Sequence, residues 1–236
     1  MFKNLKPLDR EAHRHWKYRS PQGFGFASGE LSVPVTVVEA IEICKYYPIV
    51  FPDNGAPTPQ ALLTIDGKTN AYVGADGSWK VPYIPAHIRR YPIILGPIEG
   101  EVPAAVNGAA ELRFNVLFDD EGFFNAEEGE PLFTASGEDG PLLKDVLSFV
   151  GLFQNEWVLT ERLAAELDKA NILVPQQVEI QHQDGSKTQL GGFRTIDPAA
   201  LAKVDGATFL RWRESGLLTL IYAHQFSLSN IGRMVN

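Results

Sequence analysis

Glycine and proline occur so often in the first half of this chain that no long helix is expected there. The 236 residues include 21 Gly and 16 Pro, and many of them lie before residue 139. Both residues interrupt regular structure, glycine through its backbone freedom and proline through its missing N–H. Only short elements fit between such breaks, and short strands joined by turns are the arrangement that this spacing favours.

The alternation of apolar residues places these short elements. Asp66-Gly67 and Asp76-Gly77 are typical tight turns between strands. The alternation in Leu112, Phe114, Val116 and Phe118 is the clearest strand pattern in the chain. A short helix is expected over 35–47, ended by Pro48, and one helical turn over 85–90. The expected strands are 24–33, 49–51, 61–65, 71–73, 79–83, 92–95 and 111–118.

The second half has helical periodicity instead. Asp139 can cap a helix with Pro141 in its first turn, and an apolar stripe continues to about residue 171, with a break near 151 or 155 left open. A hairpin is expected from 178–182 and 189–195, followed by short helices at 198–203 and 208–214 and an amphipathic stripe over 217–231. Strands first and helices later predict an α+β fold, mostly antiparallel and β-rich in the N-terminal half, with helices concentrated in the C-terminal half.

The expected organisation is an arm and one domain. Residues 1–20 form a basic, aromatic arm, and residues 21–236 form a single α+β domain. A further boundary near 138–140 is left open, because the late hairpin could equally return to the first sheet.

The charge is unevenly distributed. The chain has 21 Lys+Arg and 29 Asp+Glu, a net charge of −8, but residues 1–20 carry +4 and residues 98–140 carry −10. A net acidic chain is a poor binder of nucleic acid, because phosphate neutralisation requires clustered cations. The arm is suited instead to an acidic protein surface, either its own 98–140 region or that of a second copy. The predicted partner is therefore a protein or peptide, with a homo-oligomer through these two regions as one form.

Hydropathy predicts a soluble protein without membrane insertion. The longest apolar stretches are about six or seven residues, far below the roughly 20 needed to span a bilayer, and no apolar run follows the basic start as in a secretory signal. The single cysteine, Cys44, excludes an internal disulfide. These features together favour a cytoplasmic location.

The densest cluster of polar and aromatic residues lies between positions 79 and 92. Trp79, Tyr83, Arg89, Arg90 and Tyr91 are the candidate ligand-binding residues, because arginine with aromatic residues recognises carboxylates, phosphates, sugars or protein surfaces. Adjacent arginines point in different directions, so one ligand is expected to meet at most one of them. The alternative is a surface turn whose arginines pair with nearby acids.

His224 is the candidate catalytic residue, as a general base on the last apolar stripe. Its other interpretation, a packed core histidine, is the default at such a position. No Gly-x-Ser-x-Gly motif is present, and Gly191-Gly192 is not followed by the Lys-Ser/Thr of a phosphate-binding loop. The His13-x-His15 pair lies among cations that would repel a metal. No metal and no cofactor are predicted.

Several segments in a fixed order resemble the SapC family of bacterial proteins, named for a surface-layer gene cluster. They span about residues 20–232. The segments are Tyr47-Pro48-Ile49-Val50-Phe51, Asn70-Ala71-Tyr72-Val73, Asp76-Gly77-Ser78-Trp79, Tyr83-Ile84-Pro85, Arg89-Arg90-Tyr91-Pro92, Glu130-Pro131-Leu132-Phe133, Gly192-Phe193-Arg194-Thr195-Ile196-Asp197 and the stretch 217–231 with Tyr222-Ala223-His224 and Ser227-Leu228.

The resemblance implies an accessory role and assigns no residue a function. Genes of this family lie near those for TonB-dependent receptors, flavin-dependent halogenase-like proteins and cupin-like proteins. The expected function is therefore a soluble accessory or binding protein of surface-layer or outer-membrane uptake systems, which recognises a protein, peptide or glycan through an aromatic–arginine groove. The alternative is an enzyme or enzyme subunit that modifies a peptide or glycan, with His224 and Arg89 or Arg90 in its site.

Overall fold

The structure is a computed structural model, and it forms two compact units. It describes residues 1–97, 104–106, 109–111, 114–121, 123–124, 127–181 and 185–234. Unit 1 comprises Met1–Gln22 and Arg90–Gln154, and unit 2 comprises Gly23–Arg89 and Asn155–Asn236. Each unit therefore combines segments that are far apart in the sequence. The predicted division into an arm (1–20) and one domain (21–236) stays a prediction.

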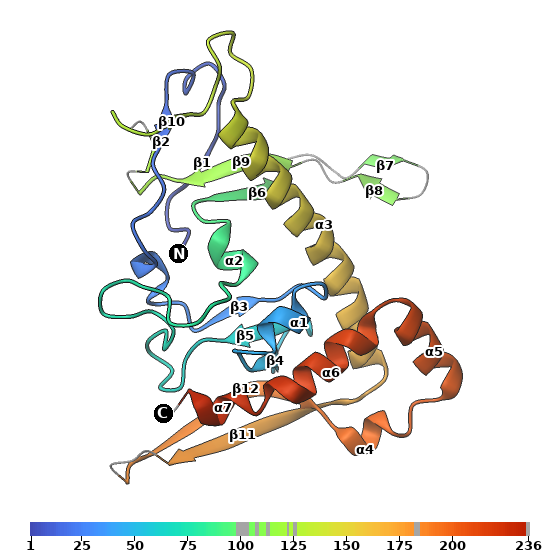
Figure 1. Ribbon diagram of the computed structural model, residues 1–236. Coiled ribbons are helices and arrows are strands. Elements are labelled where there is room, and N and C mark those ends of the chain that lie inside the picture. The colour runs from blue at the N-terminus through green and yellow to red at the C-terminus, as the bar shows by residue number, and fades with distance from the viewer. Residues whose placement is uncertain are drawn as a thin grey trace. The chain divides into compact units, whose positions relative to one another are not determined.

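Unit 2 contains a five-stranded antiparallel sheet (Figure 1) with the order β11-β12-β4-β5-β3. The late hairpin, β11 and β12, pairs with β4 from the first half of the chain through Phe193 opposite Pro52 and Arg194 opposite Phe51. The hairpin thus returns to the first sheet, which was the second of the two alternatives. The strands are β3 (Ser32–Pro34), β4 (Ile49–Pro52), β5 (Gln60–Leu62), β11 (Leu173–Gln181) and β12 (Lys187–Ile196).

Two of the short helices of unit 2 begin at aspartate caps. The carboxylates of Asp197 and Asp205 accept backbone N–H groups at the starts of α4 and α5, which satisfies donors that a helix leaves unpaired. Gly216 adopts φ 83° between α5 and α6, in the left-handed region that suits glycine. The helical elements are η1 (Gly25–Ala27), α1 (Ala40–Ile43), α2 (Ala86–Arg89), α4 (Pro198–Leu201), α5 (Gly206–Glu214), α6 (Leu217–Ser227) and α7 (Asn230–Arg233).

Helix α6 is fixed to the sheet by a fully buried histidine. His224 Nδ1 donates to the carbonyl oxygen of Ile49 on β4 at 2.7 Å, and Nε2 accepts the N–H of Ile196 on β12 at 3.1 Å. The hydroxyl of Ser227, one turn later, accepts the N–H of Ile49 at 2.8 Å and donates to the carbonyl of His224. One turn of α6 therefore pairs backbone groups of two neighbouring strands.

Unit 1 has a smaller antiparallel sheet with the order β1-β9-β6 and an aromatic core. Trp16 and Phe124 both pack against Phe118, at ring-centroid distances of 5.4 and 4.8 Å. The strands of the unit are β1 (Leu5–Pro7), β2 (Lys17–Tyr18), β6 (Ile93–Pro97), β7 (Ala104–Val106), β8 (Ala109–Glu111), β9 (Phe114–Asp119) and β10 (Glu130–Pro131).

The basic arm lies against acidic residues of the same chain. β1 pairs with β9, and Lys6 forms a 2.6 Å ion pair with Asp120. Arg10 forms a second pair with Asp139 at 2.9 Å. Part of the acidic region 98–140 lies outside the described residues. The association of two copies through these regions stays a prediction.

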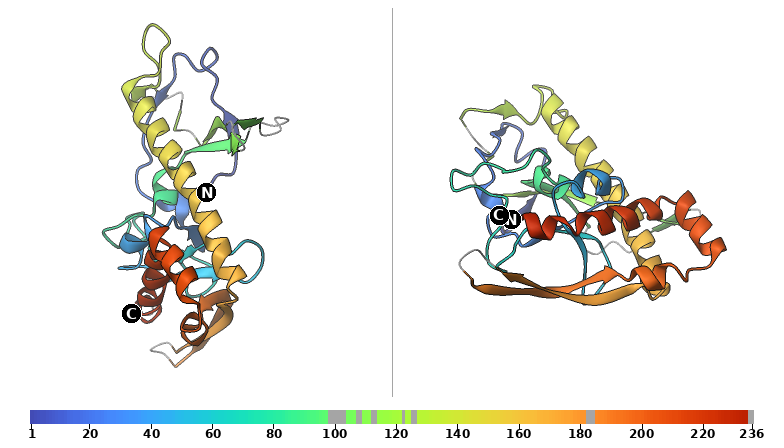
Figure 2. Two further views of the ribbon diagram at one scale, coloured as in Figure 1. Left: turned by 90° about the vertical axis from the view of Figure 1, so that its right-hand side faces the viewer. Right: turned by 60° about the horizontal axis from the view of Figure 1, so that its bottom comes forward.

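Helix α3 (Pro141–Lys169) confirms the long amphipathic helix expected after Asp139. It continues through Gly151 and Asn155 without interruption, and the division between the units falls within it. Its 29 residues, with the later helices, place most helical structure in the C-terminal part of the chain (Figure 2). The prediction of an α+β fold, with antiparallel strands mostly in the N-terminal half and helices concentrated in the C-terminal half, is confirmed.

Some local predictions are wrong. The segment 24–33 is a 3-10 turn followed by a strand that begins only at Ser32, and the predicted 35–47 helix is a single turn, Ala40–Ile43, flanked by turns. The strands at 71–73 and 79–83 reduce to one bridge between Val73 and Trp79. Pro82 lies within the second of these segments and has no N–H to donate to a ladder, which disfavours pairing there. The predicted strand end at His182 lies outside the described residues.

No helix in the described part of the chain combines the length and apolarity that a membrane crossing requires.

We expect His224→Ala to lower the free energy of unfolding by about 3 kcal/mol at pH 7, because the variant leaves a cavity and orphans a buried N–H and a buried C=O. The measurement is urea denaturation followed by circular dichroism. Tyr222→Ala, on the exposed side of the same helix, is the matched control and should change stability little. Equal losses in both variants would contradict the tethering role.

The same histidine predicts a stability loss in acid. Burial lowers the pKa of His224 from 6.5 to about 4, because the charged imidazolium would lose its contact with water. Protonation of Nε2 would also place its N–H against the N–H of Ile196. The unfolded chain binds this proton below pH 6.5 while the folded chain does not, so stability falls between pH 6.5 and 4, by about 3 kcal/mol for this group. The stability difference between wild type and His224→Gln, measured across this range, should shrink toward acid; a constant difference would refute the shift.

Candidate functional site

The predicted ligand-binding residues are divided between the two units. Trp79, Tyr83 and Arg89 belong to unit 2, whereas Arg90 and Tyr91 belong to unit 1. The five side chains therefore form two separate groups, one in each unit.

In unit 2 the aromatic side chains direct their polar ends into the fold. Trp79 Nε1 donates to the hydroxyl of Tyr47 at 2.7 Å, and that hydroxyl donates to the carbonyl of Tyr83. The Trp79 ring stacks on Tyr72 and meets Phe24 edge-on at 5.4 Å between centroids. Burial raises the pKa of both Tyr47 and Tyr72. These contacts hold the 72–83 segment against the rest of unit 2. Trp79 and Tyr83, which were predicted to contact a ligand, thus make structural contacts here.

Glu39 is the centre of this network and was not a sequence candidate. Its Oε1 accepts the Tyr83 hydroxyl at 2.9 Å and also the backbone N–H of Ala86. Its side chain is 5% exposed, and Oε2 has no hydrogen-bond partner among the described residues. Burial therefore raises the pKa of Glu39, although both hydrogen bonds favour the charged form. Burial and the neighbouring Glu39 carboxylate raise the pKa of Tyr83 to about 12.

Arg89 is the exposed member of the group. Its guanidinium lies 5.7 Å from the centroid of the Tyr83 ring, and its Nε donates to the carbonyl of Ile84 at 3.0 Å. A guanidinium near an aromatic ring gains a modest cation–π attraction. Of the five predicted residues, Arg89 presents the most accessible charge.

In unit 1 the other two residues belong to the packed interior. The guanidinium of Arg90 lies 4.5 Å from the Phe153 centroid and 5.5 Å from that of Phe2, and burial lowers its pKa to about 10. Tyr91 is 7% exposed, and burial, reinforced by the charge of Asp119, raises its pKa. The expectation that adjacent arginines diverge agrees with these separate surroundings.

His224 has both ring nitrogens engaged by backbone atoms in the core of unit 2, as described above. A general base needs a nitrogen that can reach a substrate proton. The observed hydrogen bonds therefore favour the packing interpretation over the catalytic one.

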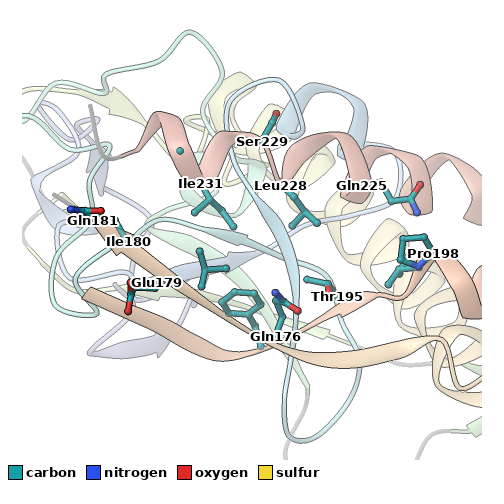
Figure 3. A pocket seen from close by; sticks show the side chains of 14 residues that line it. Gln176, Glu179, Ile180, Gln181, Thr195, Pro198, Gln225, Leu228, Ser229 and Ile231 are labelled. Atoms are coloured by element: carbon teal, nitrogen blue, oxygen red, sulfur yellow. The ribbon is translucent and has the colours of Figure 1, made fainter. Parts of the chain in front are cut away.

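Unit 2 contains a groove of about 820 Å³ (Figure 3). It lies between the β11–β12 hairpin and helices α6 and α7, with Leu228 and Ile231 directed from the helical side toward the strands. Its volume is within the range of about 300–1,000 Å³ of small-molecule and cofactor sites. No motif or pattern in the sequence pointed to a site at this position.

The floor of the groove is apolar and its rim is polar but uncharged. Ile180, Phe193 and Ile231 form the floor and belong to one buried hydrophobic cluster. Among the described residues of the lining one is charged, Glu179, and it is paired with Lys187 at 2.7 Å. The rim consists of side chains that both donate and accept hydrogen bonds: Gln176, Gln181, Thr195, Gln225 and Ser229.

A β-bulge gives the hairpin its shape at this point. Gln176 is opposite Phe193 and Val178 is opposite Leu190, so Gly191 and Gly192 together face one residue of β11. Gly192 has φ 81°, the left-handed conformation that glycine adopts in such bulges. A bulge bends its strand and re-aims the next side chain, here Phe193, which lines the groove. The Gly-Gly pair therefore shapes the strand.

Comparisons with known proteins identify a family. The SapC family model matches residues 8–234, nearly the whole chain. No curated protein and no solved structure matches this chain.

We expect Glu39→Gln to stabilise the protein at pH 8. The amide oxygen can still accept from Tyr83 and Ala86, while the buried charge is removed. Because the folded pKa is raised above its usual 4.5, stability from this group is full at low pH and is lost as pH rises through the folded pKa. Thermal unfolding at pH 4 and pH 8 tests this: the variant's gain should appear only at the higher pH. Glu42→Gln, a half-buried acid on the same short helix, is the control.

Proposed function

The chain belongs to the SapC family, as the match over 8–234 shows, and we propose that it works as a binding protein whose partner occupies the groove of unit 2. The partner is a protein or peptide. The observation that supports this most strongly is the groove itself, an apolar floor with a neutral hydrogen-bonding rim on a sheet and two helices. Binding sites of this kind combine apolar area for affinity with a few polar groups for orientation.

The surface of α6 supports a protein partner rather than a small molecule. Tyr222 and Phe226, on the same helix as the groove residue Gln225, are 41% and 72% exposed. Exposed large apolar side chains beside a concave site are typical of protein interaction surfaces. Arg89, exposed beside Tyr83, offers a second, charged contact elsewhere on the unit.

The biological setting is proposed from the family. An accessory role in surface-layer or outer-membrane uptake systems is suggested by the genes among which such proteins lie, and the cytoplasm is the location that the hydropathy and the single cysteine favour. The glycan alternative has less support, because the groove floor is aliphatic apart from one buried phenylalanine, whereas sugars favour exposed aromatic platforms.

The enzyme alternative requires His224 as the base and an arginine beside it. His224 makes its two hydrogen bonds to Ile49 and Ile196, and Arg89 makes its contacts to Tyr83 and Ile84. No observation favours a shared reaction site for them, and the binding function is the one we retain.

Gly232→Trp tests the proposed function. Gly232 lines the groove, has an ordinary backbone conformation, and a Cβ added there meets no atom within 4 Å. The indole should fill the groove without disturbing the core. Wild type and variant, each immobilised, are exposed to lysate of the native host, and proteins identified by mass spectrometry are then purified and titrated. We expect at least tenfold weaker binding to the variant.

Gly206→Trp is the matched control, since this helical glycine of the same unit also has open space around its Cβ but lies on α5, away from the groove. It should bind like wild type. A purified partner that binds Gly232→Trp as tightly as wild type would show that the groove is not the binding site.

A further inference from the structure

A smaller pocket in unit 2, separate from the groove, concentrates positive charge. Its volume is about 370 Å³, and three stretches that are distant in the sequence line it. Each stretch contributes one cation: Lys45 follows α1, Lys80 lies in the 72–83 segment, and Arg233 ends α7. Among the described residues no acidic side chain lines the pocket. The chain has 29 acidic and 21 basic residues, so composition alone does not predict this cluster of cations.

Hydrogen bonds between the three stretches fix the walls of the pocket. The hydroxyl of Tyr72 donates to the carbonyl of Tyr46 at 2.9 Å, and the backbone N–H of Lys80 donates to the carbonyl of Tyr72 at 2.9 Å. Asn230 on α7 is 1% exposed, and its amide donates to the carbonyl of Cys44 at 2.8 Å. The backbone that carries the three cations is therefore preformed, which lowers the ordering cost of binding a ligand.

Two of the cations have neutral partners. Lys80 Nζ donates to the carbonyl of Ala71 at 2.7 Å, and Arg233 Nη1 donates to Oδ1 of the buried Asn230 at 3.2 Å. Neither cation is ion-paired with an acid in the described part of the chain. Both side chains belong to exposed residues, so an incoming anion can reach them.

The third cation is already compensated. Lys45 Nζ forms a 2.6 Å ion pair with Glu42, and the two side chains are 48% and 47% exposed. The pocket therefore offers two uncompensated positive charges. A phosphate monoester carries a charge of about −1.5 to −2 at pH 7 and three strong acceptor oxygens, so it matches them in charge. Arginine binds phosphate through its planar fork and lysine binds it as a point charge.

The rest of the lining selects the body of the ligand. Tyr46, Val81 and Met234 are partly exposed and give the pocket apolar surface beside its cations. Its volume of about 370 Å³ is near the lower end of the range of about 300–1,000 Å³ for small-molecule sites. A small molecule with an apolar or aromatic part next to its anionic group fits this combination.

We propose that this pocket binds a small phosphorylated molecule, whose phosphate contacts Lys80 and Arg233 and whose apolar part contacts Tyr46, Val81 and Met234. The inference goes beyond the proposed binding function. No described residue lines both the groove and this pocket, so either site can fail its test without the other.

Phenyl phosphate is the probe, titrated into the intact protein at pH 8 and followed by nuclear magnetic resonance. Phenyl sulfate, of the same shape but with one negative charge, is the matched ligand and should bind at least tenfold more weakly. We expect Arg233→Gln and Lys80→Gln each to weaken phenyl phosphate binding at least tenfold. Arg213→Gln, which replaces an exposed arginine of α5 outside the pocket, should stay within twofold of wild type.

Glu42→Gln separates the effect of charge from a loss of structure. It releases Lys45 from its ion pair, so it should tighten phenyl phosphate binding by about threefold at low ionic strength, which a disturbed fold would not do. Unchanged affinity in this variant, or in both Arg233→Gln and Lys80→Gln, would overturn the inference. So would equal affinity for phenyl sulfate, or the absence of saturable binding at millimolar phenyl phosphate.

Discussion

The two hydrogen bonds of His224 are the contacts on which the architecture of unit 2 depends. β4 lies in the first quarter of the chain and β12 in its last quarter, and a single buried imidazole on α6 pairs a carbonyl of one with an N–H of the other. A buried polar group is costly unless it is hydrogen-bonded, and here each nitrogen has its complement. The neutral form is required, since one nitrogen must accept. The folded state therefore excludes the proton that the free side chain binds near pH 6.5.

The groove follows from the position that this histidine gives to α6. With α6 held over β12 and β4, Leu228 at its end and Ile231 on α7 pack with Ile180 of β11 in one apolar cluster and line the groove. The Gly191-Gly192 bulge bends β12 opposite β11 and turns Phe193 into the floor. The His224 hydrogen bonds, which position α6, and the Gly191-Gly192 bulge, which bends β12, thus together shape the groove.

Much of the fold follows from local patterns. The helix α3, the hairpin and the buried strand at 49–52 each have strong periodicity or turn signals, so their type was predictable. The strands expected at 71–73 and 79–83 reduce to one bridge, because Pro82 and a network of tyrosine hydrogen bonds replace ladder pairing there. The site was less accessible still. Arg89 and Arg90 are adjacent in the sequence, yet one is exposed beside Tyr83 and the other packs between phenylalanines.

Composition and periodicity by themselves determined the α+β class, the order of strands and helices, and the concentration of basic residues at the start against acidic residues near the middle. The fold class, the order of elements and the charge distribution depend on residues that are close in the chain, so they can be read directly from the sequence. Only the tertiary structure decided which strands pair across more than a hundred residues, that Glu39 is a buried carboxyl, and that residues of β11, β12, α6 and α7 line one groove. These are contacts between distant segments, and no local pattern in the sequence records which distant segments meet.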